Sequence, residues 1–302
     1  MTEADFLATL RALPLHPGAR GLADDTALVA GFVVTTDTLV EGVHFLAADP
    51  PRDVAWKLLA TNLSDIAAKG AAIEGVLLNY PLRDDAWDRA FLAGFGEALA
   101  HFGARLIGGD TVSLPPGAPR ILTLTAIGSD AAAPARDGAQ AGDVLWVTGT
   151  IGDAGAGLSI AQGAPGPEAL LAAYRRPTPR MAEGRALAPQ VHAMMDVSDG
   201  LLLDASRMAA ASGLAVAVDL AAVPLSPSYR VHAGDSRAAR LAAATAGDDY
   251  ELLFAAATGF VPPVGATAVG RFAPGAGLTL HQSGTPIPIP PKLGFEHACA
   301  ID

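Results

Sequence analysis

The stretch VVTTDTLVEGVHF, residues 33–45, decides the fold of this chain. Its beginning, residues 32–35, is rich in β-branched and aromatic side chains, which predicts a strand. After it, residues 53–69 carry Trp56, Leu59, Leu63 and Ile66 at near-helical spacing, which predicts a helix. A short strand followed by an apolar helix is typical of α/β architecture.

The same alternation of short apolar runs and helical patterns continues along the chain. Further strands are predicted at residues 76–80, 121–127, 144–148, 215–218 and 252–256. Further helices are predicted at residues 85–102, 181–187 and 201–212. The fold class that follows is α/β, or mixed α+β.

The length of 302 residues favours two domains. Residues 129–142, SDAAAPARDGAQAG, form a stretch of small residues with Pro and Gly between two predicted strands, and the division is therefore placed between 1–133 and 134–302. Residues 162–167 read as a surface loop. Residues 286–291, PIPIPP, are expected at a sheet edge because proline donates no backbone hydrogen bond.

Composition restricts the class of protein. A hydrophobic content of 51% with 17% charged residues indicates a folded globular chain, and a net charge of −11 argues against nucleic acid as a partner. The first ten residues have no basic n-region, and Pro262 and Pro263 interrupt the longest apolar stretch, so neither a secretory signal nor a membrane span is predicted. The single cysteine, Cys299, fits a cytoplasmic location.

Aspartates that follow apolar runs beside Gly, Ser or Thr are the unusual feature. They are Asp24, Asp25, Asp37, Asp65, Asp110, Asp196, Asp199, Asp248 and Asp249. Any one of them alone is most simply a turn or helix-cap residue. Together, on strands that end at one crevice, they would repel each other strongly and so imply bound cations. Mg²⁺ is the expected ion, because it prefers carboxylate oxygens and is commonly shared with phosphates.

No G-x-x-x-x-G-K-[ST] motif occurs, and the chain has three lysines: Lys57, Lys69 and Lys292. A triphosphate would therefore be neutralised by metal ions and arginines. The run GTIGDAGAGL, residues 149–158, follows a predicted strand. It could place backbone N–H groups around a phosphate, or be a simple strand-to-helix turn.

The chain resembles the thiamine-monophosphate kinases, a branch of the superfamily that includes aminoimidazole ribonucleotide synthetase. The resemblance runs nearly end to end and in order through ADD, TTDTLVEGVHF, NLSDIAAKGA, LIGGDT, VTGTIGDAGAGL, RRPTPR, DVSDGLLLD, GDDYELLF and GFEH. It implies an N-terminal domain that pairs its sheet with that of a second copy, in a homodimer, and a C-terminal α/β domain that completes the cleft for ATP.

The resemblance also implies a reaction and a set of site residues. The reaction is direct transfer of the γ-phosphoryl group of ATP to thiamine monophosphate, assisted by several Mg²⁺ ions. The implied metal ligands are Asp25, Thr35, Thr36, Asp37, Asp65, Asp110, Asp196 and Asp199, of which Asp37, Asp110 and Asp199 are taken as catalytic. The implied ATP contacts are Gly109, Asp110, Arg136 and Ser198. The implied thiamine monophosphate contacts are His44, Asp248 and Phe295.

Three residues depart from the family pattern. Asp248 stands where glutamate is usual, Phe295 replaces an aromatic residue that carries a polar group, and Ala23 replaces a glycine before the paired acids. The carboxylate of Asp248 is one methylene shorter than that of glutamate and reaches less far towards the substrate. The three departures therefore concern substrate contacts more than the transfer of the phosphoryl group.

Two other interpretations remain at this point. One is another ATP-dependent enzyme of the superfamily. Against it, residues 1–20 lack the cysteine and lysine of selenophosphate synthetase, Cys299 is not terminal as in the hydrogenase-maturation enzyme, and VEGVHF is absent from aminoimidazole ribonucleotide synthetase. The other is a non-catalytic binding protein in which metal ions on the aspartates are structural.

Overall fold

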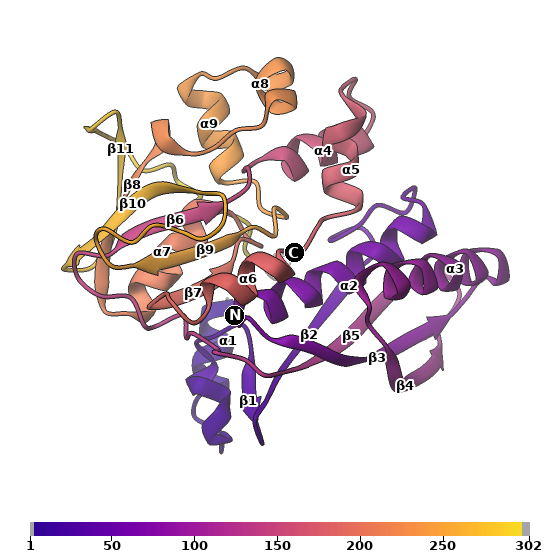
Figure 1. Ribbon diagram of the computed structural model, residues 1–302. Helices are drawn as coiled ribbons and strands as arrows, with labels where there is room; N and C mark the ends of the chain where they lie inside the picture. Colours follow the sequence, from indigo (N-terminus) through magenta and orange to yellow (C-terminus); the bar gives the residue numbers. More distant parts are fainter. Residues whose placement is uncertain (1–2, 298–302) are drawn as a thin grey trace.

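The computed structural model describes residues 3–297, arranged as two α/β lobes (Figure 1). Cys299 lies outside the described residues. The first lobe holds a five-stranded sheet in the order β1-β2-β5-β3-β4. Its strands are β1 (Ala27–Val29), β2 (Phe32–Val40), β3 (Ala72–Leu82), β4 (Leu106–Ser113) and β5 (Ile121–Ser129). Its helices are α1 (Glu3–Leu10), η1 (Pro17–Leu22), α2 (Pro51–Ala68) and α3 (Asp85–Phe102).

Helix α2 lies between the two lobes (Figure 1). Every residue from Val54 to Ala68 is buried, because one side packs on β2 and β5 and the other on α6 and β7. Because a buried polar group needs a hydrogen-bond partner, a buried helix carries polar side chains only where they contact polar groups or line a functional site. At the crossing with α6, a Cβ on Gly184 would lie 2.0 Å from the carbonyl oxygen of Ala67, so glycine is required for this close approach.

The second lobe holds a seven-stranded sheet in the order β12-β11-β8-β10-β6-β9-β7. Its strands are β6 (Val144–Thr148), β7 (Ala193–Asp196), β8 (Leu214–Asp219), β9 (Leu252–Ala256), β10 (Ala266–Pro274), β11 (Gly277–Gln282) and β12 (Thr285–Ile287). Its helices are α4 (Asp153–Ala161), α5 (Glu168–Arg175), α6 (Met181–Leu187), α7 (Leu201–Ala211), η2 (Leu220–Ala222), α8 (Pro227–Ala233) and α9 (Arg237–Ala244).

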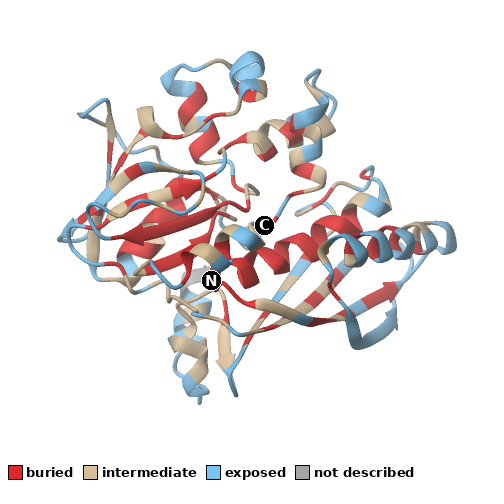
Figure 2. Ribbon diagram, in the orientation of Figure 1, coloured by how far each residue is buried: buried red, intermediate tan, exposed pale blue. Residues whose placement is uncertain are grey.

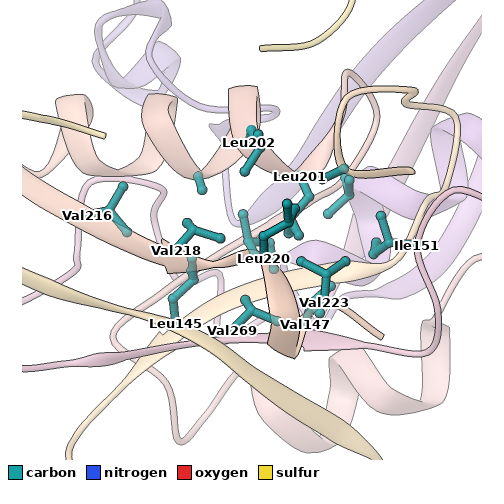
Figure 3. Close-up of a cluster of buried hydrophobic side chains, with 14 of the residues drawn as sticks. Leu145, Val147, Ile151, Leu201, Leu202, Val216, Val218, Leu220, Val223 and Val269 are labelled. Carbon is teal, nitrogen blue, oxygen red and sulfur yellow. The ribbon is translucent and has the colours of Figure 1, made fainter. Parts of the chain in front are cut away.

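The core of the second lobe lies between α7 and its sheet. Figure 3 shows Leu201 and Leu202 of α7 beside Val216 and Val218 of β8, and each of them is at most 1% exposed. This core holds β7 and the start of α7 in fixed positions, and the loop that joins them faces the first lobe.

The fold class is confirmed, and every strand and helix named from the sequence is present. Several are longer than predicted: β2 extends to Val40 and β3 spans Ala72–Leu82. Residues 162–167 form a loop between α4 and α5, and β12 is an edge strand, both as expected. The elements that were not predicted are short or contain many Gly and Ala residues, such as β4, α4 and α9. The division after residue 133 falls in the connection between β5 and β6 and stays a prediction.

The outer face of the first sheet is open. In Figure 2, β4 is exposed along its length while α2 is buried, and all eight residues of β4 are exposed. Large apolar side chains lie exposed on all five strands of this sheet. They are Val29, Phe32, Leu82, Leu106, Ile107, Val112 and Ile121. Within the described part of the chain, no helix is both long and apolar enough to cross a membrane.

Candidate active site

A cleft of about 650 Å³ lies between the two lobes. One wall is formed by the second half of β2, the turn after it and α2, and the other by the loop after β7 and the segment before β9. Its lining includes Thr36, Asp37, His44, Asp65, Asp196, Ser198, Asp199, Asp248, Tyr250 and Phe295. The cleft therefore brings together most of the residues that the resemblance assigned to metal, nucleotide and acceptor.

Three carboxylates converge at the inner end of the cleft. Asp25, Asp65 and Asp196 each offer an oxygen atom, and these three atoms lie within 4.8 Å of one another. Asp37 belongs to the same group electrostatically, because its charge acts on both Asp65 and Asp196. Close carboxylates of this kind are stable as anions only with compensating positive charge.

The sequence suggested that these acids lie at strand ends, but only some of them do. Asp196 does end β7, but Asp37 lies in the middle of β2, and Asp65 lies inside α2. Asp37 is on the β2 face that contacts α2, where its backbone N–H donates to Asn62 Oδ1 at 3.1 Å. The convergence results from packing a polar stretch of α2 against β2 and β7. It does not follow from a shared sheet edge.

The pKa values show how the cluster is balanced. Burial, reinforced by Asp37 and Asp196, raises the pKa of Asp65 well above its ordinary value. Burial and the charge of Asp25 raise the pKa of Asp196 in the same way and that of Asp37 to about 6. The three groups therefore lie in a low-dielectric site where each disfavours ionisation of the others.

Asp25 is the exception. Burial would raise its pKa, but Arg136 and then Lys69 outweigh burial, and the pKa of Asp25 lies below its usual value. Arg136 Nη2 donates to Asp25 Oδ1, and Lys69 Nζ lies 3.5 Å from Asp25 Oδ2. Lys69 is fully buried and also pairs with Asp24 Oδ1 at 2.5 Å. Basic groups of the chain itself therefore supply part of the missing positive charge.

Thr35 and Thr36 place their hydroxyl groups differently. Thr35 Oγ1 donates to the carboxylate of Asp65, so this hydroxyl belongs to the acidic cluster. Thr36 Oγ1 lies on the opposite face of β2 and donates to the carbonyl oxygen of Leu124 at 3.1 Å. Of these two adjacent residues, Thr35 presents its side chain to the cluster, and Thr36 offers its backbone.

The loop after β7 anchors the second wall. The backbone N–H of Asp248 donates to the carbonyl oxygen of Ser198 at 2.7 Å, and that of Phe295 donates to the carbonyl of Asp199 at 2.8 Å. The Asp199 side chain pairs with Arg207 on α7. Ser198 and Asp199 thus hold two separate segments, one carrying Asp248 and the other Phe295, against the cleft.

An aromatic group lines the outer end of the cleft. The rings of His44, Phe295 and His297 lie close together, with centroids 6.5 Å apart for His44 and Phe295, and 5.3 Å apart for His44 and His297. His44 Nδ1 accepts the backbone N–H of Val40 at 3.0 Å, which requires Nδ1 to be unprotonated. Burial and the neighbouring His297 lower the pKa of His44. His44 is therefore a neutral ring that carries its proton on Nε2, directed away from Val40.

Asp248 carries two fixed hydrogen bonds. Lys57 Nζ lies 2.7 Å from Asp248 Oδ2, and the hydroxyl of Tyr250 lies 2.9 Å from Asp248 Oδ1. The backbone of Asp248 has φ 62°, a left-handed conformation that glycine, asparagine and aspartate adopt more readily than other residues. The geometry holds this carboxylate at the cleft wall with its charge paired.

Asp110 and Gly109 are not in this cleft. Both lie in the exposed edge strand β4, separated from β2 by β3 and β5. Asp110 Oδ1 accepts the N–H of Thr111 at 2.9 Å. A Cβ on Gly109 would lie 1.8 Å from the carbonyl oxygen of Leu78, so this glycine allows β4 to pair with β3. Within one chain these two predicted ATP contacts lie apart from the other site residues.

Sequence reasoning did not assign several residues to this site. Lys57, Lys69 and Tyr250 contact the predicted carboxylates directly, and Asn62 and Thr61 bond to Asp37 from α2. The lysines could have been noticed, since the chain has only three and two of them lie in the predicted helix at residues 53–69. The glycine-rich run before α4 forms a turn whose Gly152 N–H donates to Asp249 Oδ1 at 2.8 Å.

The donor set fits Mg²⁺. Asp25, Asp65 and Asp196 offer hard oxygen ligands at separations that a small cation can bridge, and their mutual repulsion favours such an ion. Among the acids of residues 3–297, this trio is the one group of three whose ligand atoms meet so closely.

Comparisons with known proteins show the family to which the chain belongs. Residues 23–129 match the family described as AIR synthase related protein, N-terminal domain, and residues 140–263 match its C-terminal domain. Thiamine-monophosphate kinase from Caulobacter vibrioides is 37% identical, over 98% of this chain and 91% of that protein. The corresponding enzyme of Escherichia coli K12 is 38% identical, over 78% and 75%.

A solved structure described as AaThiL complexed with AMPPCP and TMP has a TM-score of 0.87 and 28% identity. It covers 98% of this chain and 97% of that one. The cleft between two AIR synthase-type domains, its converging acids and these matches lead to one conclusion. The chain belongs to the AIR synthase related family and, within it, to the thiamine-monophosphate kinases.

Proposed function

We propose that the protein transfers the γ-phosphoryl group of ATP directly to the phosphate of thiamine monophosphate, giving thiamine diphosphate and ADP. The observation that carries this proposal is the division of one cleft into an acidic inner end and an aromatic outer end. Two phosphates can approach each other only where positive charge is supplied, and a flat cationic acceptor suits aromatic walls.

The chain's own residues position the reactants. Asp25, Asp65, Asp196 and Asp37 would hold Mg²⁺ at the inner end, with Thr35, the backbone of Thr36 and Asp199 as further ligands. When bound, Mg²⁺ supplies the positive charge that offsets the phosphate oxygens. Arg136 and Ser198 would contact ATP. Arg136 Nε is buried and, among the described residues, has no hydrogen-bond partner, which leaves a donor for a phosphate oxygen.

The acceptor would lie at the outer end. Phe295 and His44 form walls for its rings, and Asp248 offers carboxylate oxygens between them. With donor and acceptor in a single cleft, in-line transfer needs no phosphorylated side chain, and catalysis comes from positioning and charge neutralisation. A cytoplasmic location, where ATP is available, belongs to the same proposal.

The test is a direct assay. Purified protein with ATP, Mg²⁺ and thiamine monophosphate should form thiamine diphosphate and ADP in equal amounts, followed by chromatography. Labelled γ-phosphate should not remain on the protein when the acceptor is omitted. Absence of product, with turnover of a different phosphorylated acceptor, would overturn the proposal.

We also propose that the site is completed by a second copy of the chain. Each of the five strands of the first sheet carries at least one exposed large apolar side chain, and such residues mark interaction surfaces when a partner covers them. Asp110 lies on the exposed edge strand of that sheet, three strands from Asp37. Pairing of two such sheets in a homodimer would cover the apolar residues, and would bring Asp110 and Gly109 of one copy towards the cleft of the other.

A further inference from the structure

Lys57 connects the two walls of the outer cleft. It lies on α2 in the first lobe and is only 2% exposed. Its ammonium group reaches the second lobe, where Nζ lies 2.7 Å from Asp248 Oδ2. The resemblance to known kinases assigned no role to this lysine, and the proposed transfer does not use it.

Three contacts surround the Lys57 ammonium group. Besides Asp248, it donates to the carbonyl oxygen of His44 at 3.1 Å, and it lies 4.2 Å from the ring centroid of Tyr174. Tyr174 is itself fixed, since its hydroxyl donates to Asp49 Oδ2 at 2.9 Å. Lys57 therefore contacts both Asp248 and His44, the two polar residues expected to bind the acceptor.

The charge balance at Asp248 is the informative feature. A buried ammonium group is tolerated only with a well-placed counter-charge, and Asp248 provides it. The Asp248 side chain is 33% exposed, and it lines the cleft. Each of its oxygens accepts one fixed donor, Lys57 or Tyr250, and a carboxylate oxygen can accept a second hydrogen bond. The carboxylate thus retains acceptor capacity while its charge is already paired.

We propose that Lys57 is a positioning residue for the acceptor: it holds Asp248 and the His44 backbone in place and pairs the Asp248 charge, so that Asp248 recognises an amino group by hydrogen bonding. This inference rests on the proposed function. Besides its phosphate, thiamine monophosphate offers two recognisable features, an uncharged aminopyrimidine amine and a positively charged thiazolium ring. The paired carboxylate suits the amine, and the aromatic wall of Phe295 is left for the thiazolium.

Two other roles for Lys57 make opposite predictions. If Asp248 bound the thiazolium by charge, Lys57 would weaken that attraction, and its removal would lower the KM for thiamine monophosphate. If Lys57 only joined the lobes, its removal would lower the melting temperature and the kcat, and would change the KM for both substrates alike. The positioning role predicts a higher KM for one substrate only.

The experiment compares Lys57→Met with Lys57→Arg. Met keeps the approximate length and packing of the side chain but removes its charge and its hydrogen-bond donors. Arg keeps the charge and the donors. We expect Lys57→Met to raise the KM for thiamine monophosphate about tenfold, the loss expected for a charged hydrogen bond, with the KM for ATP within twofold. Lys57→Arg should recover most of the difference. The control is Arg89→Met, which removes an exposed cation that pairs with Asp85 on α3 and should leave both KM values unchanged.

The outcomes separate the possibilities. If the wild-type protein forms no thiamine diphosphate, the proposed function fails, whatever the variants do. If the wild type is active and Lys57→Met lowers the KM for thiamine monophosphate, or changes both KM values equally, the positioning role is overturned. Should Lys57→Met not fold, Lys57→Gln, which keeps a donor but removes the charge and leaves Asp248 unaltered, must show the same difference between the two KM values.

Discussion

The two ends of the cleft solve opposite electrostatic problems. At the inner end, Asp37, Asp65 and Asp196 lie together, and the pKa of each is raised, first by burial and then by the charges of neighbouring aspartates. At the outer end, Lys57 pairs with Asp248, and His44 is a neutral ring. On the proposed function, bound cations would offset the acidic charge at the inner end, whereas at the outer end Lys57 already pairs with the Asp248 carboxylate. This contrast fits a site that must bring two phosphates together while holding one flat organic group.

The largest effect is expected from removing a carboxylate of the inner end. Asp65→Asn should reduce kcat by about 100- to 1000-fold, since the variant loses a carboxylate that would hold Mg²⁺, and the bound ion would supply the positive charge that stabilises the transferring phosphoryl group. The same change should leave the melting temperature unchanged or higher without Mg²⁺, because the neutral amide does not repel the neighbouring carboxylates. Steady-state kinetics and thermal unfolding measure the two effects. Activity within tenfold of wild type would remove Asp65 from the metal site.

The sequence carried more information about the inner end than about the outer end. Each acid stood out as an Asp with Gly, Ser or Thr within two residues, and the order of the motifs implied its family role. Their convergence was expected for the wrong reason, because α2 crosses between the lobes and brings Asp65 to β2, which no local pattern predicts. Lys57 was noted only as one of three lysines. Its partner Asp248 is 191 positions away, and such a pair becomes visible only in the folded chain.

Asp110 tests whether the inner end is completed in one chain or by two. Asp37→Asn and Asp110→Asn should each be nearly inactive as homodimers. If Asp110 acts on the partner's cleft, a mixed dimer of the two variants contains one unaltered site and one doubly altered site. Random mixing should then restore about a quarter of wild-type activity, since half of the dimers are mixed. Co-expression with two different tags and a kinetic assay measure this.

The mixed dimer also has a clear contrary outcome. If Asp110 acted within its own chain, every site in the mixed dimer would carry one substitution, and activity would stay at the level of the single variants. The matched control mixes Asp37→Asn with Asp65→Asn, two residues of the same wall. That pair should give no recovery, because within the described structure both belong to one chain's cluster.

The smallest effect concerns the pH dependence of the outer end. The pKa of His44 lies below its usual value because of burial and His297, with Lys57 contributing in the same sense and Asp248 and Asp199 opposing. His44 is therefore neutral near pH 7.5 and gains a proton only below its lowered pKa. Protonation would break the hydrogen bond from Val40 and place a positive charge beside the cationic acceptor. We expect the KM for thiamine monophosphate to rise as the pH falls from 7.5 to 5.5, approaching about fivefold as His44 becomes protonated, which is the effect of roughly 1 kcal/mol between near charges in a wet site.

The matched variant is His44→Asn, whose side-chain oxygen can still accept the Val40 N–H but does not titrate in this range. Its KM for thiamine monophosphate should vary less with pH than that of wild type, and the KM for ATP should vary equally in both. The lowered pKa also affects stability. As the pH falls through about 6.5, His44 takes up a proton in the unfolded chain before it does so in the folded one, so the free energy of unfolding of the wild type decreases. That of His44→Asn should decrease less, because the asparagine does not titrate. Identical KM profiles in the two proteins would show that His44 does not sense the acceptor's charge, and the Lys57–Asp248 pair and the aromatic wall would then distinguish the outer end from the inner one.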